Sequence, residues 1–254
     1  MTWSLAAGLE DRAVLVTGAA GGIGAEVCAA FAAAGSRVAA VDLCEEKLEA
    51  LVAGLPDSQR HVSFGADLRN LDDVDALVDR TYQELGQLDI VAHLAGVILR
   101  PNDVMDVTAE DWAFQEEVNL RATFFLDRAA AQRMRATGVQ GRIINFTSQA
   151  WWTGGSSVVY AATKGGVVSI TRGLARIFAP AGITVNCIAP GYVDTPMLRK
   201  DVSEETLESF RAQVPLGRFA LPSDVTGAVL FLASQHASYI TGITLNLTGG
   251  QLVY

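Results

Sequence analysis

The first 35 residues place a buried strand, a glycine-rich turn and a helix in direct succession, an order that few folds accommodate. Residues 13–17 read AVLVT, and residues 17–24 read TGAAGGIG. The apolar residues that follow recur at the spacing of one helix face: Val27, Ala30, Phe31 and Ala34. An unbroken apolar strand is typical of a parallel sheet that is covered on both faces. This order therefore predicts a β–α–β unit and an α/β fold.

The same alternation continues to the end of the 254-residue chain. Further strands are expected at 38–41, 62–64, 90–94, 142–146, 183–188 and 243–247, and helices near 45–51, 71–85, 108–137, 158–178 and 222–234. Residues 190–215 are expected to be irregular or to form short helices. Right-handed crossovers then favour a Rossmann-like, doubly wound parallel sheet of about seven strands with helices on both faces. We expect a single domain over residues 1–254.

Composition excludes several classes of partner. The net charge of −9 disfavours nucleic acid and anionic membranes, which bind clustered Lys and Arg. No apolar run reaches the length of a membrane span, and residues 1–12 lack the pattern of a secretory signal. The three cysteines and three histidines form no metal-ligand or disulfide pattern. A cytoplasmic protein without a metal site is expected.

The glycine-rich turn predicts a dinucleotide site. Glycine lets backbone approach a pyrophosphate closely, and the next helix offers free N–H groups at its N-terminus. The turn lacks the Lys-Ser/Thr ending of a triphosphate-binding loop. Asp42 ends the second strand 24 residues after Gly18, where a carboxylate would bind ribose hydroxyls and repel a ribose phosphate. NAD is therefore expected in preference to NADP. Asp67, at the end of the third strand, is placed to meet the adenine.

Four polar residues predict the chemistry. Tyr160 and Lys164 are four residues apart on one helix face, so the ammonium is expected to lower the pKa of the phenol from about 10 and make it an acid/base. Ser148 follows the fifth strand, at the edge of the sheet where ligands bind. Asn119 lies in the middle of a long helix, an unfavourable place for Asn unless its amide is used.

These features together resemble the classical short-chain dehydrogenase/reductase (SDR) family over essentially the whole chain. The resemblance rests on Thr17–Gly24, Asp42, Asp67, Asn119, Ser148, Tyr160, Lys164, Pro190-Gly191 with Thr195, and the tail from Gly242 to Gly249-Gly250. Each piece is common by itself, whereas their joint occurrence is highly specific.

The resemblance implies the role of each residue. Tyr160 would exchange the hydroxyl proton, Lys164 would hold the nicotinamide ribose and tune Tyr160, and Ser148 would orient the substrate oxygen. Asn119 would carry a proton-relay water, and Thr195 would hold the carboxamide. The implied cofactor contacts are Gly18, Gly22, Ile23, Gly24, Asp42, Leu43, Asp67, Leu68, Ala95, Gly96, Tyr160, Lys164, Pro190, Gly191, Val193 and Thr195. The expected reaction moves a hydride between NAD(H) and a secondary alcohol or ketone.

The sequence departs from the family pattern in two places. The segment after the fourth strand reads His93-Leu94-Ala95-Gly96, so Leu94 replaces an Asn that binds backbone near the adenosine. His93 is expected to be structural. Ser148 also lies one residue closer to Tyr160 than is usual; Thr147 would restore the spacing, but the position of the strand end favours Ser148.

The substrate is expected to be a polyol, a sugar or a cyclic alcohol. Its expected contacts are Ser148, Ala150, Trp151, Trp152, Tyr160 and Gly191. The two tryptophans could instead pack in the core or in a subunit interface, and the sequence favours neither reading. By resemblance, residues 192–216 are expected to form a substrate lid, and the helices at 108–137 and 158–178 the interface of a homodimer or homotetramer.

Two other functions remain open. A 3-oxoacyl reductase acting on carrier-protein or coenzyme-A esters is one, although Asp42 and the absence of basic residues at 138–141 and 179–182 speak against a carrier-protein substrate. A non-catalytic dinucleotide-binding regulator on the same fold is the other. The presence of Ser148, Tyr160 and Lys164 speaks against it.

Overall fold

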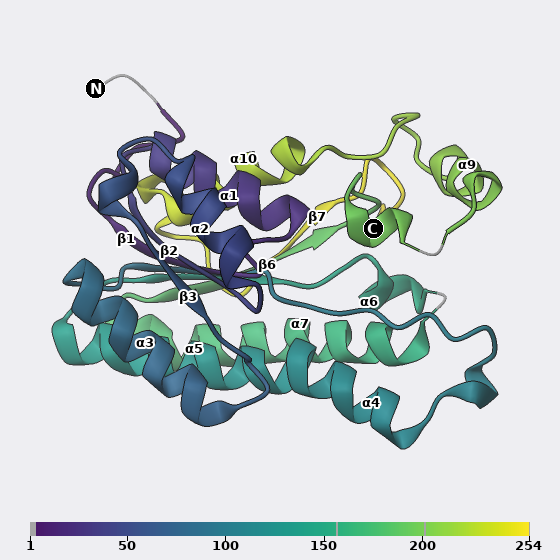
Figure 1. Ribbon diagram of the computed structural model, residues 1–254, viewed down its shortest axis with the longest axis horizontal. Helices are drawn as coiled ribbons and strands as arrows, with labels where there is room; N and C mark the ends of the chain where they lie inside the picture. The colour runs from purple at the N-terminus through teal and green to yellow at the C-terminus, as the bar shows by residue number, and fades with distance from the viewer. Residues whose placement is uncertain (1–3, 156, 201, 254) are drawn as a thin grey trace.

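The parallel sheet that the apolar runs predict is present in the computed structural model, which describes residues 4–155, 157–200 and 202–253 (Figure 1). Its strands, all parallel, are β1 (Ala13–Thr17), β2 (Arg37–Asp42), β3 (Val62–Gly65), β4 (Ile90–His93), β5 (Arg142–Phe146), β6 (Thr184–Pro190) and β7 (Thr244–Leu247). Within the described residues they form one seven-stranded sheet in the order β3-β2-β1-β4-β5-β6-β7. The strand order reverses between β1 and β4, which is where such sheets bind ligands. The predicted doubly wound Rossmann-like fold is confirmed.

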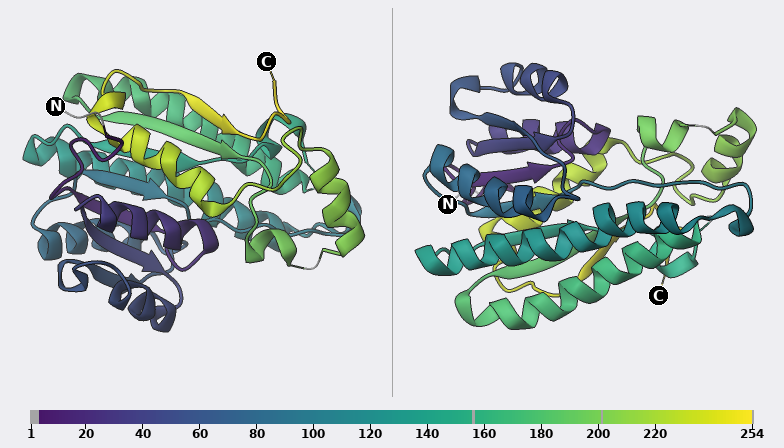
Figure 2. Two further views of the ribbon diagram at one scale, coloured as in Figure 1. Left: turned by 90° about the horizontal axis from the view of Figure 1, so that it is seen from above. Right: turned by 60° about the horizontal axis from the view of Figure 1, so that its bottom comes forward.

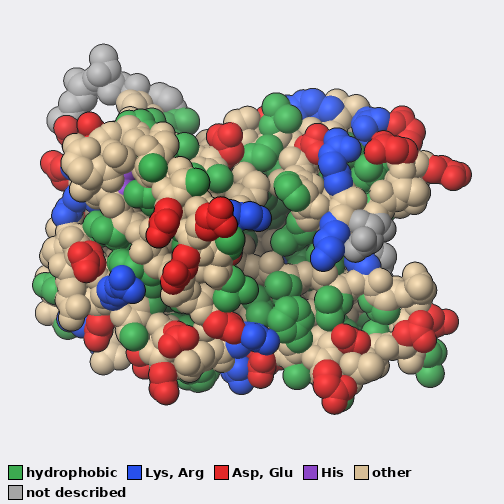
Figure 3. Space-filling view, in the orientation of Figure 1, with side chains coloured by type: hydrophobic (Ala, Val, Ile, Leu, Met, Phe, Trp, Pro, Cys, Tyr) green, Lys and Arg blue, Asp and Glu red, His purple; other side chains and the backbone are tan. Residues whose placement is uncertain are grey.

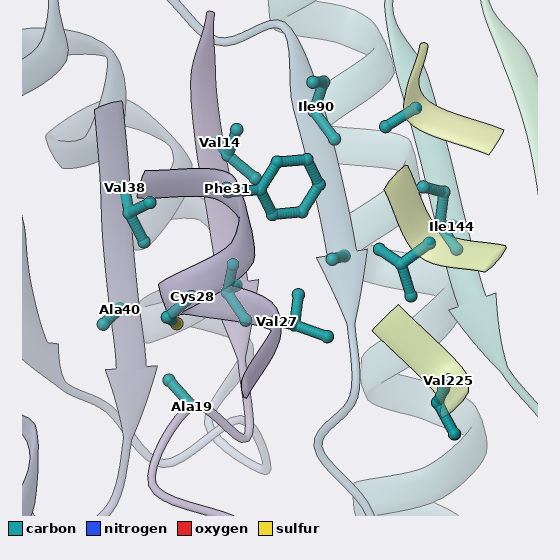
Figure 4. Packing of buried hydrophobic residues seen from close by; sticks show 14 of the residues in the cluster. Val14, Ala19, Val27, Cys28, Phe31, Val38, Ala40, Ile90, Ile144 and Val225 are labelled. Carbon is teal, nitrogen blue, oxygen red and sulfur yellow. The ribbon is translucent and has the colours of Figure 1, made fainter. Parts of the chain in front are cut away.

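Helices cover both faces of the sheet (Figure 1). One layer contains α1 (Gly22–Ala33), α2 (Glu45–Ala53) and α10 (Pro222–Ala233), and the other contains α3 (Leu71–Leu85), α4 (Ala109–Glu116), α5 (Ala122–Thr137) and α7 (Val158–Phe178). Short 3-10 turns lie at Ser58–Arg60, Val104–Asp106, Ala179–Ala181 and Gln235–Ala237. Each layer buries its own apolar cluster against the sheet. Figure 4 shows one of them, in which Val27 and Phe31 of α1 pack over Val14 and Ile90.

The helix expected over residues 108–137 is present but contains an irregularity. It begins at a capping box, in which the Asp111 amide donates to Thr108 Oγ1 (3.0 Å) and the Thr108 amide to Asp111 Oδ2 (3.1 Å). Residues Glu117–Arg121 then form a π-helical turn between α4 and α5. Such turns are rare and occur frequently at functional sites, and this one contains Asn119.

The predicted lid lies at the carboxyl end of the sheet, apart from the main core. It includes α8 (Pro196–Arg199) and α9 (Glu204–Ala212), and one of its residues, Asp201, lies outside the described residues. This part of the chain has a small apolar cluster of its own, in which Tyr192 stacks on Phe210 with ring centroids 4.6 Å apart. Figure 2 shows its helices, in green, extending beyond the ends of the strands.

Two further findings concern the described residues only. None of their helices has both the length and the hydropathy required to cross a membrane. They also contain no group of three or more His, Cys, Asp or Glu side chains arranged to hold a metal ion.

A buried carboxyl group lies under the carboxyl edge of the sheet. Asp127 of α5 is fully buried, and its Oδ2 accepts a hydrogen bond from Asn145 Nδ2 of β5 at 2.7 Å. Asp127 Oδ1 and Asn145 Oδ1 are both buried and have no hydrogen-bond partner among the described residues. Burial raises the pKa of Asp127 to about 7. The neutral acid is favoured because desolvation disfavours the carboxylate by more than the single hydrogen bond from Asn145 stabilises it.

This carboxyl group predicts a pH dependence of stability. The folded chain keeps the Asp127 proton up to about pH 7, whereas an unfolded Asp loses it near pH 4. The free energy of unfolding should therefore fall as the pH rises from about 4 through 7. Asp127→Asn mimics the neutral acid, so we expect it to stabilise the chain by roughly 2 to 4 kcal/mol at pH 8 and by little at pH 4. Urea denaturation at both pH values measures this. Glu84→Gln, at an exposed position on α3, is the control, and an equal effect of Asp127→Asn at both pH values would contradict the prediction.

Candidate active site

A cavity of about 900 Å³ opens at the carboxyl edge of the sheet. Its walls are the glycine-rich turn after β1, the segments that follow β4, β5 and β6, the first turns of α7, and the lid. Figure 3 shows this face hollowed between the part that carries α9 and the part that carries α4, with hydrophobic side chains inside the hollow. It is the place that the strand order predicts for a ligand.

The glycine-rich turn has room for backbone only. Gly18 adopts a φ of +67°, and a Cβ there would lie 2.7 Å from the amide nitrogen of Ala95. A Cβ on Gly24 would lie 2.1 Å from the Gly18 carbonyl oxygen. Gly21 precedes α1 without any side-chain cap, so the first N–H groups of that helix are left for a ligand. This cradle fits the pyrophosphate of a dinucleotide.

The acidic residues at the ends of β2 and β3 do not line the cavity. Asp42 accepts hydrogen bonds from the amides of Ala20 (3.0 Å) and Leu43 (2.7 Å), so its carboxylate braces the glycine-rich turn. Asp67 pairs with Arg69 at 2.6 Å, and this hydrogen bond holds the pKa of the carboxyl group below its ordinary value. Of the predicted cofactor contacts, those that line the cavity are Gly18, Gly22, Ile23, Gly24, Gly96, Tyr160, Lys164, Pro190, Gly191, Val193 and Thr195, and those that do not are Asp42, Leu43, Asp67, Leu68 and Ala95.

The structure brings Ser148 and Tyr160 together. Both line the cavity, and the two side chains share a hydrogen bond. The Thr147 hydroxyl instead donates to the backbone oxygen of Lys164 at 2.7 Å, in the interior. The residue beside the phenol is therefore Ser148, despite its shortened spacing from Tyr160.

Lys164 is a buried cation at the floor of the site. Its Nζ donates to the Phe146 backbone oxygen at 2.9 Å and lies 5.7 Å from the centroid of the Tyr160 ring. Burial lowers the pKa of Lys164 to about 8, because desolvation disfavours the ammonium. The side chain is thus fixed by main chain, and at pH 7 most of it still carries the positive charge.

The pKa of Tyr160 is higher than the sequence led us to expect. Burial raises it above its ordinary value, while the hydrogen bond from Ser148 and the charge of Arg100 lower it in part. The expected lowering of this pKa by Lys164 is not found, since desolvation outweighs both the Ser148 hydrogen bond and the charge of Arg100. Arg100, distant in sequence, is the cation that acts on the phenol.

Asn119 is fully buried next to the cavity and holds two of its walls together. Its Oδ1 accepts from the Val97 amide (2.8 Å), and its Nδ2 donates to the Val97 oxygen (2.9 Å) and to Thr163 Oγ1 (3.2 Å). It therefore connects the segment after β4 to α7. Asn119 does not line the cavity itself.

His93, the last residue of β4, and Leu94, which follows it, have different surroundings. His93 is buried, with Nδ1 2.7 Å from the Thr17 hydroxyl, and burial lowers its pKa to about 3. A neutral imidazole that bridges β4 and β1 agrees with a structural role. Leu94 lines the cavity, where its side chain offers only apolar contact.

The tryptophans do not lie where a substrate wall was predicted. Ala150 lines the cavity, but Trp151 and Trp152 do not. Their rings meet edge to face, with centroids 5.2 Å apart, and the Arg172 guanidinium lies 5.9 Å from the Trp151 ring. Both are the middle residues of the short helix α6 (Ala150–Thr153). This placement supports the packing alternative.

Several cavity residues were missed from the sequence. They are polar or charged side chains with no motif around them: Lys47, Arg100, Gln149, Tyr192, Gln213 and Gln251. Only Gln149 had a usable signal, because it directly follows Ser148.

A glycine-rich cradle that fits a pyrophosphate, beside Ser148, Tyr160 and Lys164 in one cavity, defines an oxidoreductase of the nicotinamide-dependent type. Comparison with known proteins agrees. A family model described as enoyl-(acyl carrier protein) reductase matches residues 18–251. The chain is 37% identical over 250 residues to 2-dehydro-3-deoxy-D-gluconate 5-dehydrogenase of Escherichia coli strain K12, covering 96% of each.

Other relatives have different names at the same identity. D-threitol dehydrogenase of Mycolicibacterium smegmatis is 37% identical over 248 residues (96% of this chain, 94% of the relative). The 3-oxoacyl-[acyl-carrier-protein] reductase FabG of Vibrio cholerae is 37% identical over 243 residues (95% and 98%). A crystal structure of a putative short-chain alcohol dehydrogenase from Sinorhizobium meliloti 1021 superposes with a TM-score of 0.92 at 33% identity, covering 98% of each chain. The chain belongs to the short-chain dehydrogenase/reductase family.

Gly96 offers a test of this geometry. A Cβ there would lie 3.2 Å from Asn119 Oδ1 and 3.3 Å from Lys164 Nζ, so either side chain would have to shift. We expect Gly96→Ala to lower kcat by about tenfold or more, since small displacements at a reacting centre are costly, and to leave the melting temperature nearly unchanged. Gly227→Ala, in α10 with no atom near the added methyl group, is the control. Equal kcat for both variants would contradict the assignment.

Proposed function

We propose that this chain is an NAD-dependent dehydrogenase that interconverts a secondary alcohol and a ketone, with Tyr160 as the acid/base. The observation that supports this most is the meeting of Ser148, Tyr160 and Lys164 in one cavity with the glycine-rich turn. A bound nicotinamide would supply the hydride acceptor or donor. Gly18, Gly22 and Gly24 would hold its pyrophosphate, and Thr195, at the β6 end of the cavity, its carboxamide.

The residues of this chain would handle the proton and the orientation. In the oxidative direction the ionised Tyr160 takes the hydroxyl proton while the carbon gives up its hydride and the C=O bond forms; reduction reverses each step. Ser148 holds the substrate oxygen next to the phenol. Lys164, fixed by the Phe146 carbonyl, positions the ribose and contributes positive charge near the phenolate. Asn119 would hold the relay water and keeps α7 in register with β4.

NAD is the proposed cofactor because Asp42 ends β2, where a carboxylate would accept hydrogen bonds from ribose hydroxyl groups and repel a 2′-phosphate. The carboxylate is fixed by two backbone amides, so it cannot swing away without breaking them. A phosphate at that place would meet like charge. Lys47, in the first turn of α2, lines the cavity and carries a positive charge, which would attract such a phosphate. The preference for NAD over NADP therefore depends on repulsion of a 2′-phosphate by Asp42 exceeding its attraction by Lys47.

The substrate class that we propose is a polyol or sugar. Two relatives named for such substrates, a deoxygluconate dehydrogenase and a threitol dehydrogenase, support this. The cavity also presents the hydroxyl and amide groups of Ser148, Gln149, Thr153, Tyr192 and Gln251. A 3-oxoacyl reductase activity is the competing reading, and the carrier-protein reductase of Vibrio cholerae is as similar in sequence.

Assembly and lid closure complete the proposal. Helices α4, α5 and α7 carry exposed apolar side chains, among them Trp112, Phe124, Val158 and Ile177. They support a homodimer or homotetramer formed through α4, α5 and α7, because exposed apolar patches commonly mark interfaces. Residues 192–216 would close over the substrate, as a lid with its own small apolar cluster can do without disturbing the main core.

The proposal is tested first at Tyr160. We expect Tyr160→Phe to lower kcat by about 10² to 10⁴ while the dissociation constant for NADH, read from its fluorescence, changes little. The assay follows absorbance of the reduced cofactor with a panel of polyols, sugars, cyclic alcohols and 3-hydroxyacyl esters. Turnover by the variant within threefold of the unaltered chain would overturn the mechanism.

The cofactor preference is tested at Asp42. Removing the carboxylate removes the repulsion and leaves the positive charge of Lys47 in the cavity, so we expect Asp42→Ala to raise the ratio of kcat/KM for NADP to that for NAD by at least about tenfold. Adding Lys47→Gln should reverse part of that gain. If the unaltered chain already uses NADP better than NAD, the reading of Asp42 is wrong.

A further inference from the structure

The described lining of the cavity has an unusual charge balance. It contains three cations, Lys47, Arg100 and Lys164, and no Asp or Glu, although the chain as a whole carries a net charge of −9. Figure 3 shows Asp and Glu side chains spread over the rest of this face, with Lys and Arg side chains at the upper rim of the hollow. A cleft lined by one sign of charge concentrates ligands of the other sign. The dinucleotide accounts for Lys47 and Lys164 but not for Arg100.

Arg100 lies at the lid end of the cavity with its charge uncompensated by any ion pair of the described residues. One of its terminal nitrogens donates to the Met197 backbone oxygen at 3.2 Å, which fixes the guanidinium against α8. It lies close enough to Tyr160 to lower the pKa of the phenol. The remaining N–H donors form the planar fork that binds a carboxylate through two parallel hydrogen bonds. An anionic group of the substrate would form an ion pair with Arg100 and accept hydrogen bonds from these N–H groups.

Two glutamine side chains near Gly191 have amide oxygens that lack hydrogen-bond donors among the described residues. Gln149 Oε1 and Gln251 Oε1 are buried, and neither has a hydrogen-bond partner among the described residues. Both lie 3.3 Å from the point where a Cβ on Gly191 would sit, so they converge on one place. Gln251 also hydrogen-bonds the Tyr192 hydroxyl, which leaves its Oε1 as the free acceptor. Buried acceptors without donors are rare and costly, and substrate hydroxyl groups are suitable donors.

We infer that the substrate is a polyhydroxylated carboxylate, a sugar acid, whose carboxylate binds Arg100 and whose hydroxyl groups donate to Gln149 and Gln251. This inference rests on the proposed dehydrogenase function and specifies its substrate. A neutral polyol would make no use of the positive charge of the exposed guanidinium. An acyl chain would leave two buried amide oxygens unsatisfied, at a cost that a site built for hydroxyl groups uses to reject such ligands. Arg100, Gln149 and Gln251 are thus specificity-determining residues.

The test compares substrates that differ only in the carboxylate. Aldonates of five and six carbons are paired with alditols of the same configuration, for example D-gluconate with D-glucitol. For the best pair we expect kcat/KM to be at least tenfold higher for the aldonate. Arg100→Gln should lower kcat/KM for the aldonate at least tenfold more than for the alditol; the loss that the two share reports the effect of the guanidinium on Tyr160. Arg135→Gln removes a positive charge from the exposed end of α5, outside the cavity, and should change neither.

The role of the two glutamines is tested by replacing each with leucine, which has a similar size but cannot accept hydrogen bonds. Gln149→Leu and Gln251→Leu should each raise KM at least fivefold for both members of the pair, with kcat within threefold. An alditol that is used as well as its aldonate would overturn the inference. So would an equal loss on both members in Arg100→Gln, which would mean that Arg100 only supports the lid.

A binding measurement separates the failure of this inference from failure of the proposed function. Calorimetric titration of sodium D-gluconate and of the other aldonates into the NADH-loaded Tyr160→Phe chain needs no turnover. The inference requires at least one aldonate to bind and its affinity to fall at least tenfold when Arg100→Gln is added. Binding without turnover by the unaltered chain would refute the dehydrogenase function alone, whereas turnover of neutral alcohols without aldonate binding would refute the sugar-acid substrate alone. Absence of both would refute both.

Discussion

The site depends on one buried hydrogen bond, from Lys164 Nζ to the Phe146 carbonyl oxygen at 2.9 Å. An ammonium without a partner in the interior is costly, so the lysine has to meet an acceptor. Phe146 is the last residue of β5, and the Thr147 hydroxyl returns a bond to the backbone oxygen of Lys164 at 2.7 Å. The pair fixes the register of α7 against β5. Ser148 and Tyr160 meet because each lies at a set distance from this junction.

The same junction extends to the neighbouring helix through Asn119. A regular α-helix ties its carbonyl and amide groups to itself, and Asn is a poor residue for its interior. Here residues Glu117–Arg121 adopt a π-helical turn, and the Asn119 amide binds backbone after β4 together with Thr163 of α7. Three elements that are far apart in sequence are thereby held within a few ångströms of Gly96. This explains why an added methyl group at Gly96 would disturb both Asn119 and Lys164.

The sequence was informative where local physics decides the outcome. Strand positions followed from apolar runs, the start of α4 from the pattern at Thr108–Asp111, and the phosphate cradle from Gly18 and Gly24. Long-range packing decided the rest. The position of Trp151 outside the cavity depends on the short helix α6, and the pKa of Tyr160 depends on burial that no four-residue spacing reveals. Arg100 and Gln251 reach the cavity from a loop and from the chain end, so no local pattern marks them.

The charges around Tyr160 link substrate recognition to proton transfer. Arg100 lowers the pKa of the phenol, and burial raises it. A carboxylate bound to Arg100 would offset part of the guanidinium charge, so Tyr160 would keep its proton to a higher pH when an anionic substrate is present. A protonated phenol is the form that donates to a ketone oxygen, whereas a phenolate is the form that accepts from an alcohol. Recognition of an acid through Arg100 would therefore act on the protonation of Tyr160 through the same electrostatic contact that selects the substrate.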